Sequence, residues 1–245
     1  MRWRRFEDPL RFQIQRGRPA SSLPHRFPPL STDTHEKGRY PVAIEFADTT
    51  TTRDTFVYIA ADDPLAQPLL TDLAAEYHSR YGSYFGESAS TEISRYPVDA
   101  FAAPDGAFVV LVRDGIPIAG GAFKRFDERT AELKRIWTAA SHRRQGLARF
   151  VVAELEAESA RRGYDRVFLT TGPRQPEAKN LYLVTGYTPL FDTALTPDEV
   201  VIHAFAKSLD AQDLDVSGIT AAHYAAIRRE HADNPRFVAL IPESD

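Results

Sequence analysis

Hydrophobic residues recur along the chain with two periods, and each period predicts a different kind of element. A helix is predicted after Asp63-Pro64, where apolar residues return at every fourth position, since Asp63 suits an N-cap and Pro64 a first turn. This apolar stripe consists of Leu65, Leu69, Leu73 and Tyr77. Strands are predicted where β-branched and aromatic residues form short runs. These runs cover residues 56–59, 108–112, 116–126, 132–138, 167–169, 187–191 and 199–207.

Turn residues divide these runs and fix their order. Asp114-Gly115 separates two strands and is a strong hairpin signal. A second amphipathic helix ends at Gly163. Its apolar stripe consists of Leu147, Phe150, Val151 and Leu155. A third helix covers about residues 175–184 and ends at Gly186. The order of these elements predicts an α/β fold in which helices cover a mixed sheet.

The two ends of the chain differ in composition from the middle. Residues 1–53 are rich in proline and locally basic, so we interpret them as a solvated arm with little core of its own. An arm that binds an anionic partner is the alternative interpretation. Residues 209–245 begin acidic and then show helical spacing, which predicts a C-terminal helical extension. The spaced residues are Ile219, Tyr224 and Ile227. The predicted domain covers residues 54–208.

Composition narrows the chemistry. The chain has 245 residues, 43% of them hydrophobic, and a formal net charge of -4, which fits a globular protein and gives no nucleic-acid signature. It contains no cysteine, which excludes disulfides, a thiolate nucleophile and a cysteine-ligated zinc site. No apolar run approaches the roughly 18 residues of a membrane helix. We therefore expect a cytoplasmic protein with no membrane or nucleic-acid partner and no metal.

The segment from Leu133 to Ala148 carries the most specific chemical signal. It predicts a strand, a polar turn and the start of a helix, with Arg143-Arg144-Gln145-Gly146-Leu147-Ala148 at the junction. The first amides of a helix have no backbone partners and, together with the helix dipole, attract anions. Gly146 lets the backbone approach a phosphate closely, and the two arginines add positive charge. The junction therefore predicts a loop that binds a pyrophosphate.

At this loop the chain resembles the GNAT superfamily of N-acetyltransferases. Arg143, Gly146 and Ala148 occupy the specified positions of that family's acetyl-CoA loop. Residues 175–187 are similar to a second family signature, except that the first position is glutamine where the family often has asparagine. The resemblance spans roughly residues 54–208 and covers neither end of the chain. It implies a mixed, mostly antiparallel twisted sheet flanked by helices, of the acyl-CoA N-acyltransferase type.

The resemblance also implies roles for individual residues. Tyr182 would lie beside the thioester sulfur and protonate the leaving thiolate. The strand backbone at Ile136 and Thr138 would pair with the pantetheine arm, and Gln175 would contact the cofactor. The remaining cofactor-binding residues are those of the phosphate loop: Arg143, Arg144, Gln145, Gly146, Leu147 and Ala148.

The acceptor amine must lose a proton, because an amine with a pKa of about 10.4 is mostly charged at neutral pH. Glu132, on the strand before the loop, is the first candidate for the general base, acting directly or through water. His142, next to the loop, is the second candidate. Glu132 has an alternative interpretation as an exposed strand residue paired with a lysine or arginine, and His142 as a plain turn residue.

These features predict an acetyl-CoA-dependent N-acetyltransferase that moves an acetyl group to a primary amine by direct attack, without a covalent enzyme intermediate. A non-catalytic acyl-CoA-binding or sensing module and an interaction protein are the alternatives. The acceptor is expected to be a small-molecule or peptide amine. An aromatic segment either lines its pocket or packs a helix against a loop, and a homodimer through the C-terminal extension stays open. The segment consists of Tyr77, Tyr81, Tyr84 and Phe85.

Overall fold

The computed structural model describes residues 40–42, 54–82, 84, 89–210, 212–232, 234–235 and 239. Most of the predicted N-terminal arm therefore lies outside the described residues, as does Phe85 of the predicted aromatic segment. The predicted boundaries of the domain, at residues 54 and 208, stay predictions.

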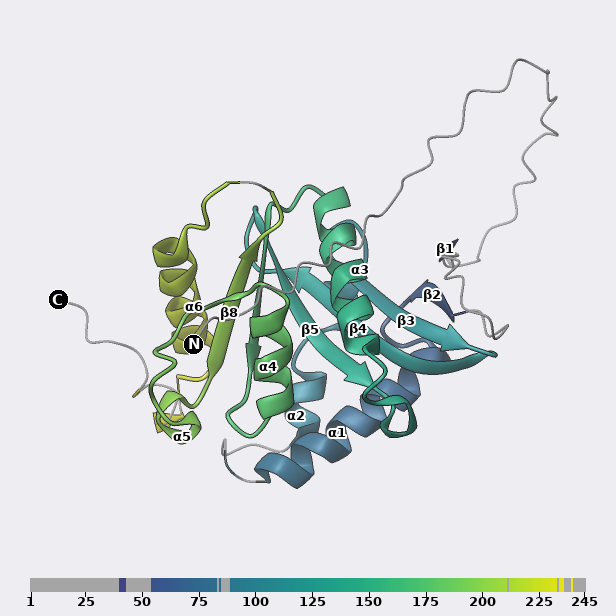
Figure 1. Ribbon diagram of the computed structural model, residues 1–245, viewed down its shortest axis with the longest axis horizontal. Coiled ribbons are helices and arrows are strands. Elements are labelled where there is room, and N and C mark those ends of the chain that lie inside the picture. Colours follow the sequence, from purple (N-terminus) through teal and green to yellow (C-terminus); the bar gives the residue numbers. More distant parts are fainter. Residues whose placement is uncertain are drawn as a thin grey trace, which may run out of the picture. The chain divides into compact units, whose positions relative to one another are not determined.

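The core of the fold is an eight-stranded sheet with the order β1-β2-β3-β4-β5-β6-β8-β7 (Figure 1). The strands are β1 (Tyr40–Val42), β2 (Asp54–Ile59), β3 (Ala107–Arg113), β4 (Ile116–Arg125), β5 (Thr130–Thr138), β6 (Arg166–Thr171), β7 (Thr188–Pro189) and β8 (His203–Ser208). Neighbouring strands are antiparallel, except that β5 and β6 run parallel. The predicted fold class, a mixed and mostly antiparallel sheet flanked by helices, is confirmed.

Helices cover both faces of this sheet (Figure 1). The α-helices are α1 (Gln67–Tyr81), α2 (Ala89–Ser94), α3 (Leu147–Arg161), α4 (Pro176–Val184), α5 (Pro197–Val200) and α6 (Val216–Glu230), and the 3-10 turns are η1 (Pro64–Ala66), η2 (Val98–Phe101) and η3 (Ala140–His142). No helix in the described part of the chain combines the length and the apolar character needed to cross a membrane.

Alternating side chains of each strand assign the helices to the two faces. In β3, Val109 and Leu111 belong to the same buried cluster as residues of α3 and α4, whereas Phe108 and Val110 pack with α1. In β6, Leu169 lies in the α3 and α4 cluster, whereas Phe168 packs with Ile219 of α6. Because the registers of β4, β5 and β6 carry this alternation across the sheet, α1 and α6 cover one face and α3 and α4 the other.

Local sequence signals account for most of the boundaries. The Asp63 side chain accepts a hydrogen bond from the Leu65 amide at 2.9 Å, as expected of the predicted cap. Asp114 and Gly115 adopt φ values of 51° and 81° at the β3–β4 turn, which confirms the predicted hairpin. The helical spacing of the C-terminal segment corresponds to α6, where Ile219 and Ile227 are buried against the sheet.

Two predictions are wrong in detail. Phe150 was assigned to the apolar stripe of its helix, but it is 45% exposed, because the buried face of α3 runs through Leu147, Val151 and Leu155. The predicted strand over residues 199–207 begins only at His203. Its first residues lie in and after α5 instead, where Thr196 and Glu199 form a capping box that stabilises a helical turn.

We predict that Gly106→Ala destabilises the protein by about 2 kcal/mol, because the site has no room for a methyl group. A Cβ atom there would lie 2.7 Å from the Phe101 Cα and 2.9 Å from the Phe123 carbonyl oxygen, and it would also meet the Ala100 carbonyl oxygen. All of these are backbone atoms that cannot move aside. Urea denaturation measures the effect, with Ile116→Ala at a 64% exposed position as the control. Equal unfolding free energies for the two variants would contradict the packing described here.

Candidate functional site

The sheet opens between β5 and β6. The two strands pair from Thr130 opposite Arg166 to Glu132 opposite Phe168, and the pairing ends there. Yet β5 continues to Thr138 and β6 to Thr171, so the later residues of both strands face a gap rather than each other. The described strands therefore separate after this short ladder.

A bulge in β5 lies at this opening. Lys134 is opposite Ala122 of β4 and Trp137 is opposite Gly120, so β5 has one more residue than β4 between these pairs. Arg135, inside the bulge, has a φ of 59°. Its guanidinium donates a hydrogen bond to the Ile93 carbonyl oxygen at 2.6 Å and lies 4.2 Å from the ring centre of Phe101. The bulge is therefore held from the side of α2 and η2, while Ile136 lines the opening.

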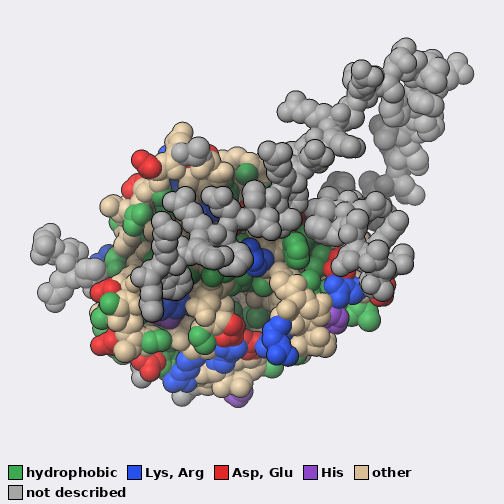
Figure 2. All heavy atoms as spheres, viewed as in Figure 1, with side chains coloured by type: hydrophobic (Ala, Val, Ile, Leu, Met, Phe, Trp, Pro, Cys, Tyr) green, Lys and Arg blue, Asp and Glu red, His purple; other side chains and the backbone are tan. Residues whose placement is uncertain are grey.

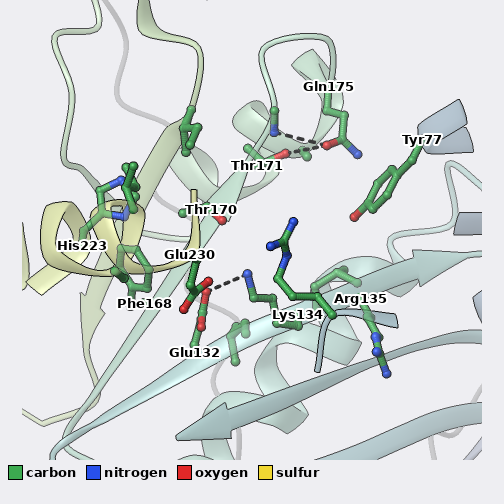
Figure 3. A pocket seen from close by; sticks show the side chains of 18 of the residues that line it. Tyr77, Glu132, Lys134, Arg135, Phe168, Thr170, Thr171, Gln175, His223 and Glu230 are labelled. Carbon is green, nitrogen blue, oxygen red and sulfur yellow. Dashed lines mark hydrogen bonds and ion pairs between the residues drawn. The ribbon is translucent and has the colours of Figure 1, made fainter. Parts of the chain in front are cut away.

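A cavity of about 210 Å³ passes through the opening (Figure 3). It is lined by residues of β5 and β6, of α1 and α4, and of α6. Leu133 and Tyr182 contribute from the layer of α3 and α4, whereas Phe168 and His223 contribute from the layer of α6. The cavity thus connects the two faces of the sheet, so two ligands can meet in it from opposite sides.

Tyr182 lies on α4 and is 5% exposed at the wall of this cavity. Its ring contacts those of Tyr187 and Phe205, with centres 5.4 and 5.6 Å away. Burial raises the pKa of the Tyr182 phenol well above its usual value. The phenol therefore carries its proton at neutral pH, which is the state that a proton donor needs. The predicted site residue lies at the cavity, and it is also a core aromatic.

Glu132 lies at the point where β5 and β6 separate, and its carboxylate is bound by two lysines. Lys124 and Lys134 each place their Nζ atom 2.7 Å from one of its oxygens. Burial alone would raise the pKa of this carboxyl, but the two lysines outweigh burial and hold its pKa below the usual value. The alternative interpretation of Glu132 as a strand residue paired with a lysine of the neighbouring strand agrees with the Lys124 contact, but the exposure that it assumed is wrong, because Glu132 is 5% exposed. This environment makes the carboxylate a weak base and argues against direct proton abstraction. His142, the second candidate, is half-buried in η3, with its Nδ1 atom 2.9 Å from the Ser141 hydroxyl.

The predicted phosphate loop follows β5 directly and leads into α3. It therefore lies at the end of β5 where the sheet is open. Arg144 and Gly146 adopt φ values of 65° and 78°, and Gly146 immediately precedes the first residue of the helix. Residues 143–146 are exposed, and Leu147 begins the buried face of α3. The first amides of a helix have no backbone partners within it and attract anions, so phosphate binding by this loop stays a prediction.

The polar side chains of the loop have different partners. Arg143 forms an ion pair with Glu76 of α1 at 2.7 Å and donates a hydrogen bond to the Thr138 carbonyl oxygen. Its positive charge is therefore balanced within the protein. Gln145 accepts a hydrogen bond from Arg113 at 3.1 Å. Arg80 continues the network by pairing with Glu76 and with Glu177 of α4. Figure 2 shows basic and acidic side chains interspersed on the lower part of this face, where α1 and α4 lie in Figure 1.

Gln175 holds the turn between β6 and α4. Its side-chain oxygen accepts hydrogen bonds from the Thr171 hydroxyl at 3.0 Å, the Gly172 amide at 3.3 Å and the Tyr81 hydroxyl at 3.3 Å (Figure 3). The glutamine thus connects α1 to the edge of the cavity. On the opposite strand, the Thr138 hydroxyl is buried and has no hydrogen-bond partner among the described residues.

Sequence reasoning missed the wall that α6 gives to the cavity. His223, Ile227 and Glu230 all line it, at a helical spacing that was visible but had no assigned partner. Burial lowers the pKa of His223 to about 4, so its imidazole is neutral at pH 7. Glu230 accepts a hydrogen bond from the Tyr96 hydroxyl at 3.2 Å. Of the predicted aromatic segment, Tyr77 and Tyr81 line the cavity, and they also contact each other.

Comparison with known proteins identifies relatives of the segment that builds this site. The family model of the acetyltransferase (GNAT) family matches residues 70–187. An uncharacterised N-acetyltransferase of Bacillus subtilis (strain 168), YsnE, is 37% identical over 93 residues, which cover 36% of this chain and 62% of the relative. The match thus spans less than two thirds of the length of that curated relative.

Solved structures share the fold. A candidate acyl-CoA N-acyltransferase from Klebsiella pneumoniae superposes with a TM-score of 0.50 at 24% identity, over 64% of this chain and 98% of its own. The GNAT domain of S. lividans PAT gives a TM-score of 0.50 at 15% identity, over 69% of this chain and 96% of its own. At these identities the likeness concerns the fold alone.

We predict that Glu132→Gln lowers the free energy of unfolding by about 3 kcal/mol at pH 7, because it leaves two half-buried lysines without their counter-charge. The folded-state pKa of Glu132 lies below 4.5, so its contribution is complete above that pH and is lost as the pH falls through the folded-state pKa. The difference between parent and variant should therefore shrink in strongly acidic solution. Denaturant titrations at pH 7 and at low pH measure it, and Glu128→Gln, at an exposed position, is the control. A difference that does not change with pH would exclude this ion pair as its source.

Proposed function

We propose that this chain, which belongs to the GNAT acetyltransferase family through residues 70–187, transfers an acetyl group from acetyl-CoA to a primary amine by direct attack. The observation that carries the proposal is the opening between β5 and β6, with Tyr182 on the wall of its cavity and the predicted phosphate loop following the end of β5. A cavity that joins both faces of the sheet suits a reaction between two substrates, since each enters from its own side.

We assign the pyrophosphate of acetyl-CoA to the amides of Gln145 to Ala148 and to the charge of Arg144. The left-handed conformation of Gly146 supports this assignment, because it turns the chain so that successive amides point the same way into solvent. Arg143 has a different role in the proposal. Its ion pair with Glu76 anchors the loop to α1, so it orients the site more than it binds phosphate.

The pantetheine arm is assigned to the edge of β5 beyond its pairing with β6. Among the described residues this pairing ends at Glu132 while β5 continues to Thr138, so we place an extended amide-containing chain along this edge. The buried Thr138 hydroxyl, which has no partner among the described residues, fits the same assignment. Ile136 provides the apolar contact at the bulge.

In the proposed transfer, Tyr182 acts as the general acid. The amine nitrogen attacks the thioester carbonyl carbon, the carbon–sulfur bond breaks, and the thiolate takes a proton from the phenol. A thiol has a pKa of about 8.5, so a phenol held beside the sulfur lowers the barrier by hydrogen bonding to the charge as it develops. The proton that the nitrogen loses restores the phenol through solvent.

Glu132 receives a modified role. Since Lys124 and Lys134 lower the basicity of its carboxylate, we propose that it fixes Lys134 in the cavity wall and polarises water there, and that bulk water accepts the amine proton. This proposal needs no strong base, because only the neutral fraction of the amine attacks. The transfer rate should accordingly follow the ionisation of the acceptor.

The first test is isothermal titration with acetyl-CoA. The parent is expected to bind, and the Arg144→Glu and Gly146→Glu double variant should lose on the order of 100-fold in affinity, because one favourable charge is reversed and a second negative charge is added beside the phosphates. Arg228→Glu, at an exposed position of α6, is the charge-reversal control and should bind like the parent. A folded parent that does not bind acetyl-CoA would remove the basis of the proposal. Binding without transfer to any amine would favour a sensing module instead.

The second test separates the acid from its neighbour. Tyr182→Phe should lower kcat by roughly 100-fold or more while acetyl-CoA affinity stays near that of the parent. Tyr187→Phe is the matched control, because its phenol is also buried in the α4 layer but donates to Glu156 at 2.8 Å. Thiol release measured with a panel of amines gives both values. Equal losses in the two variants would mean that Tyr182 acts only through packing.

A further inference from the structure

A second cavity, of about 180 Å³, lies beneath α6 on the same face of the sheet. Its walls come from β8, from the segment around β7, from α5 and from α6. Leu190, Val200, Ala204 and Tyr224 are among the side chains that line it, and most of the others are also apolar. No step of the proposed transfer uses this space.

The two cavities share a wall. Three side chains line both of them: Ile202, His223 and Ile227. The first cavity extends from the opening between β5 and β6 to these residues, and the second begins behind them, over β8. The second cavity is therefore the neighbour of the first across these three side chains.

Both carboxylates of the second cavity accept hydrogen bonds from their own loop. Asp192 accepts a hydrogen bond from the Ala194 amide at 2.8 Å, and Glu199 accepts from the amide and hydroxyl of Thr196 at 2.8 and 2.6 Å. His223 lies against the rings of Phe168 and Tyr224, with centres 5.3 and 5.7 Å away. The remaining wall favours a hydrocarbon over a charged group.

We infer that the second cavity binds the apolar tail of the acceptor, so that the acceptor is a primary amine with an alkyl or arylalkyl chain. The inference rests on the proposed function and adds the substrate class. An acyl chain on the thioester is the other hydrocarbon in such a reaction. The acceptor is favoured because the thioester is assigned beside Tyr182, in the α4 layer, whereas the second cavity lies in the α6 layer.

Direct binding tests the site without requiring turnover. Isothermal titration should give tighter binding for n-octylamine than for n-butylamine, by roughly fourfold for each methylene that enters the cavity. Ile202→Trp should remove this difference, because the larger ring fills the shared wall of the two cavities. Ala204→Leu, which fills the second cavity from β8, is the second variant, in case the first does not fold. Ile116→Trp, on the exposed β3–β4 hairpin, is the matched control.

The outcomes separate the two proposals. Equal affinities for the two amines in the parent, or a preference that survives both cavity-filling variants, would overturn the inference. If the variants instead weaken the binding of octanoyl-CoA relative to acetyl-CoA and leave the amines unchanged, the cavity holds the acyl chain and the assignment to the acceptor is wrong. Tight, variant-sensitive octylamine binding without acetyl transfer would support the amine site and count against the proposed function alone.

Discussion

The separation of β5 from β6 is the constraint on which the site depends. A parallel pair that continued past Glu132 and Phe168 would satisfy its own backbone and close the sheet. Instead, β5 takes an extra residue at Arg135 and is held from the other side by Ile93 and Phe101. The strand is thereby fixed in position beyond the point where its pairing with β6 ends. In the proposed function, a strand held in this way is a preformed partner for an extended ligand, with little ordering entropy left to lose on binding.

The buried charges at this point follow from the same geometry. Glu132 occupies the last paired position of β5, and its two lysines come from the strand beside it and from two residues further along β5. If β5 and β6 stayed paired, Glu132 and its two lysines would all be completely buried. Here the cavity reaches Glu132 and Lys134, so the charges lie at its boundary and set its local field. This arrangement explains why a carboxylate in the expected position is a poor base and yet an integral part of the wall.

Sequence patterns predicted what depends on nearest neighbours along the chain. The cap at Asp63, the hairpin at Asp114-Gly115 and the glycine before α3 each act through local backbone conformation, and so their positions were readable. Two assignments show where such patterns fail. A capping box turns the residues around Glu199 into a helix rather than a strand, and the direction in which α3 packs leaves Phe150 exposed. The loop was predicted from its helix start and from a family pattern, and Tyr182 from the family pattern. The burial of Glu132 and the ion pair of Arg143 with α1 were not predicted, since both depend on residues far apart in the chain.

The division between the two halves of the cavity has a consequence for specificity. The predicted phosphate loop, the end of β5 and Tyr182 all lie within the residues that match the family model. Ile202, His223 and Ile227 lie beyond residue 187, at the wall that α6 shares with both cavities. In the proposed function, the reaction and the choice of acceptor therefore come from different stretches of chain. Changes in α6 alter the shape of the acceptor side without touching the strand edge or the loop, because the sheet separates them. A fold divided in this way can keep one acyl donor while its acceptor changes. We expect substitutions that alter the acceptor to fall in the hydrocarbon-lined space beneath α6.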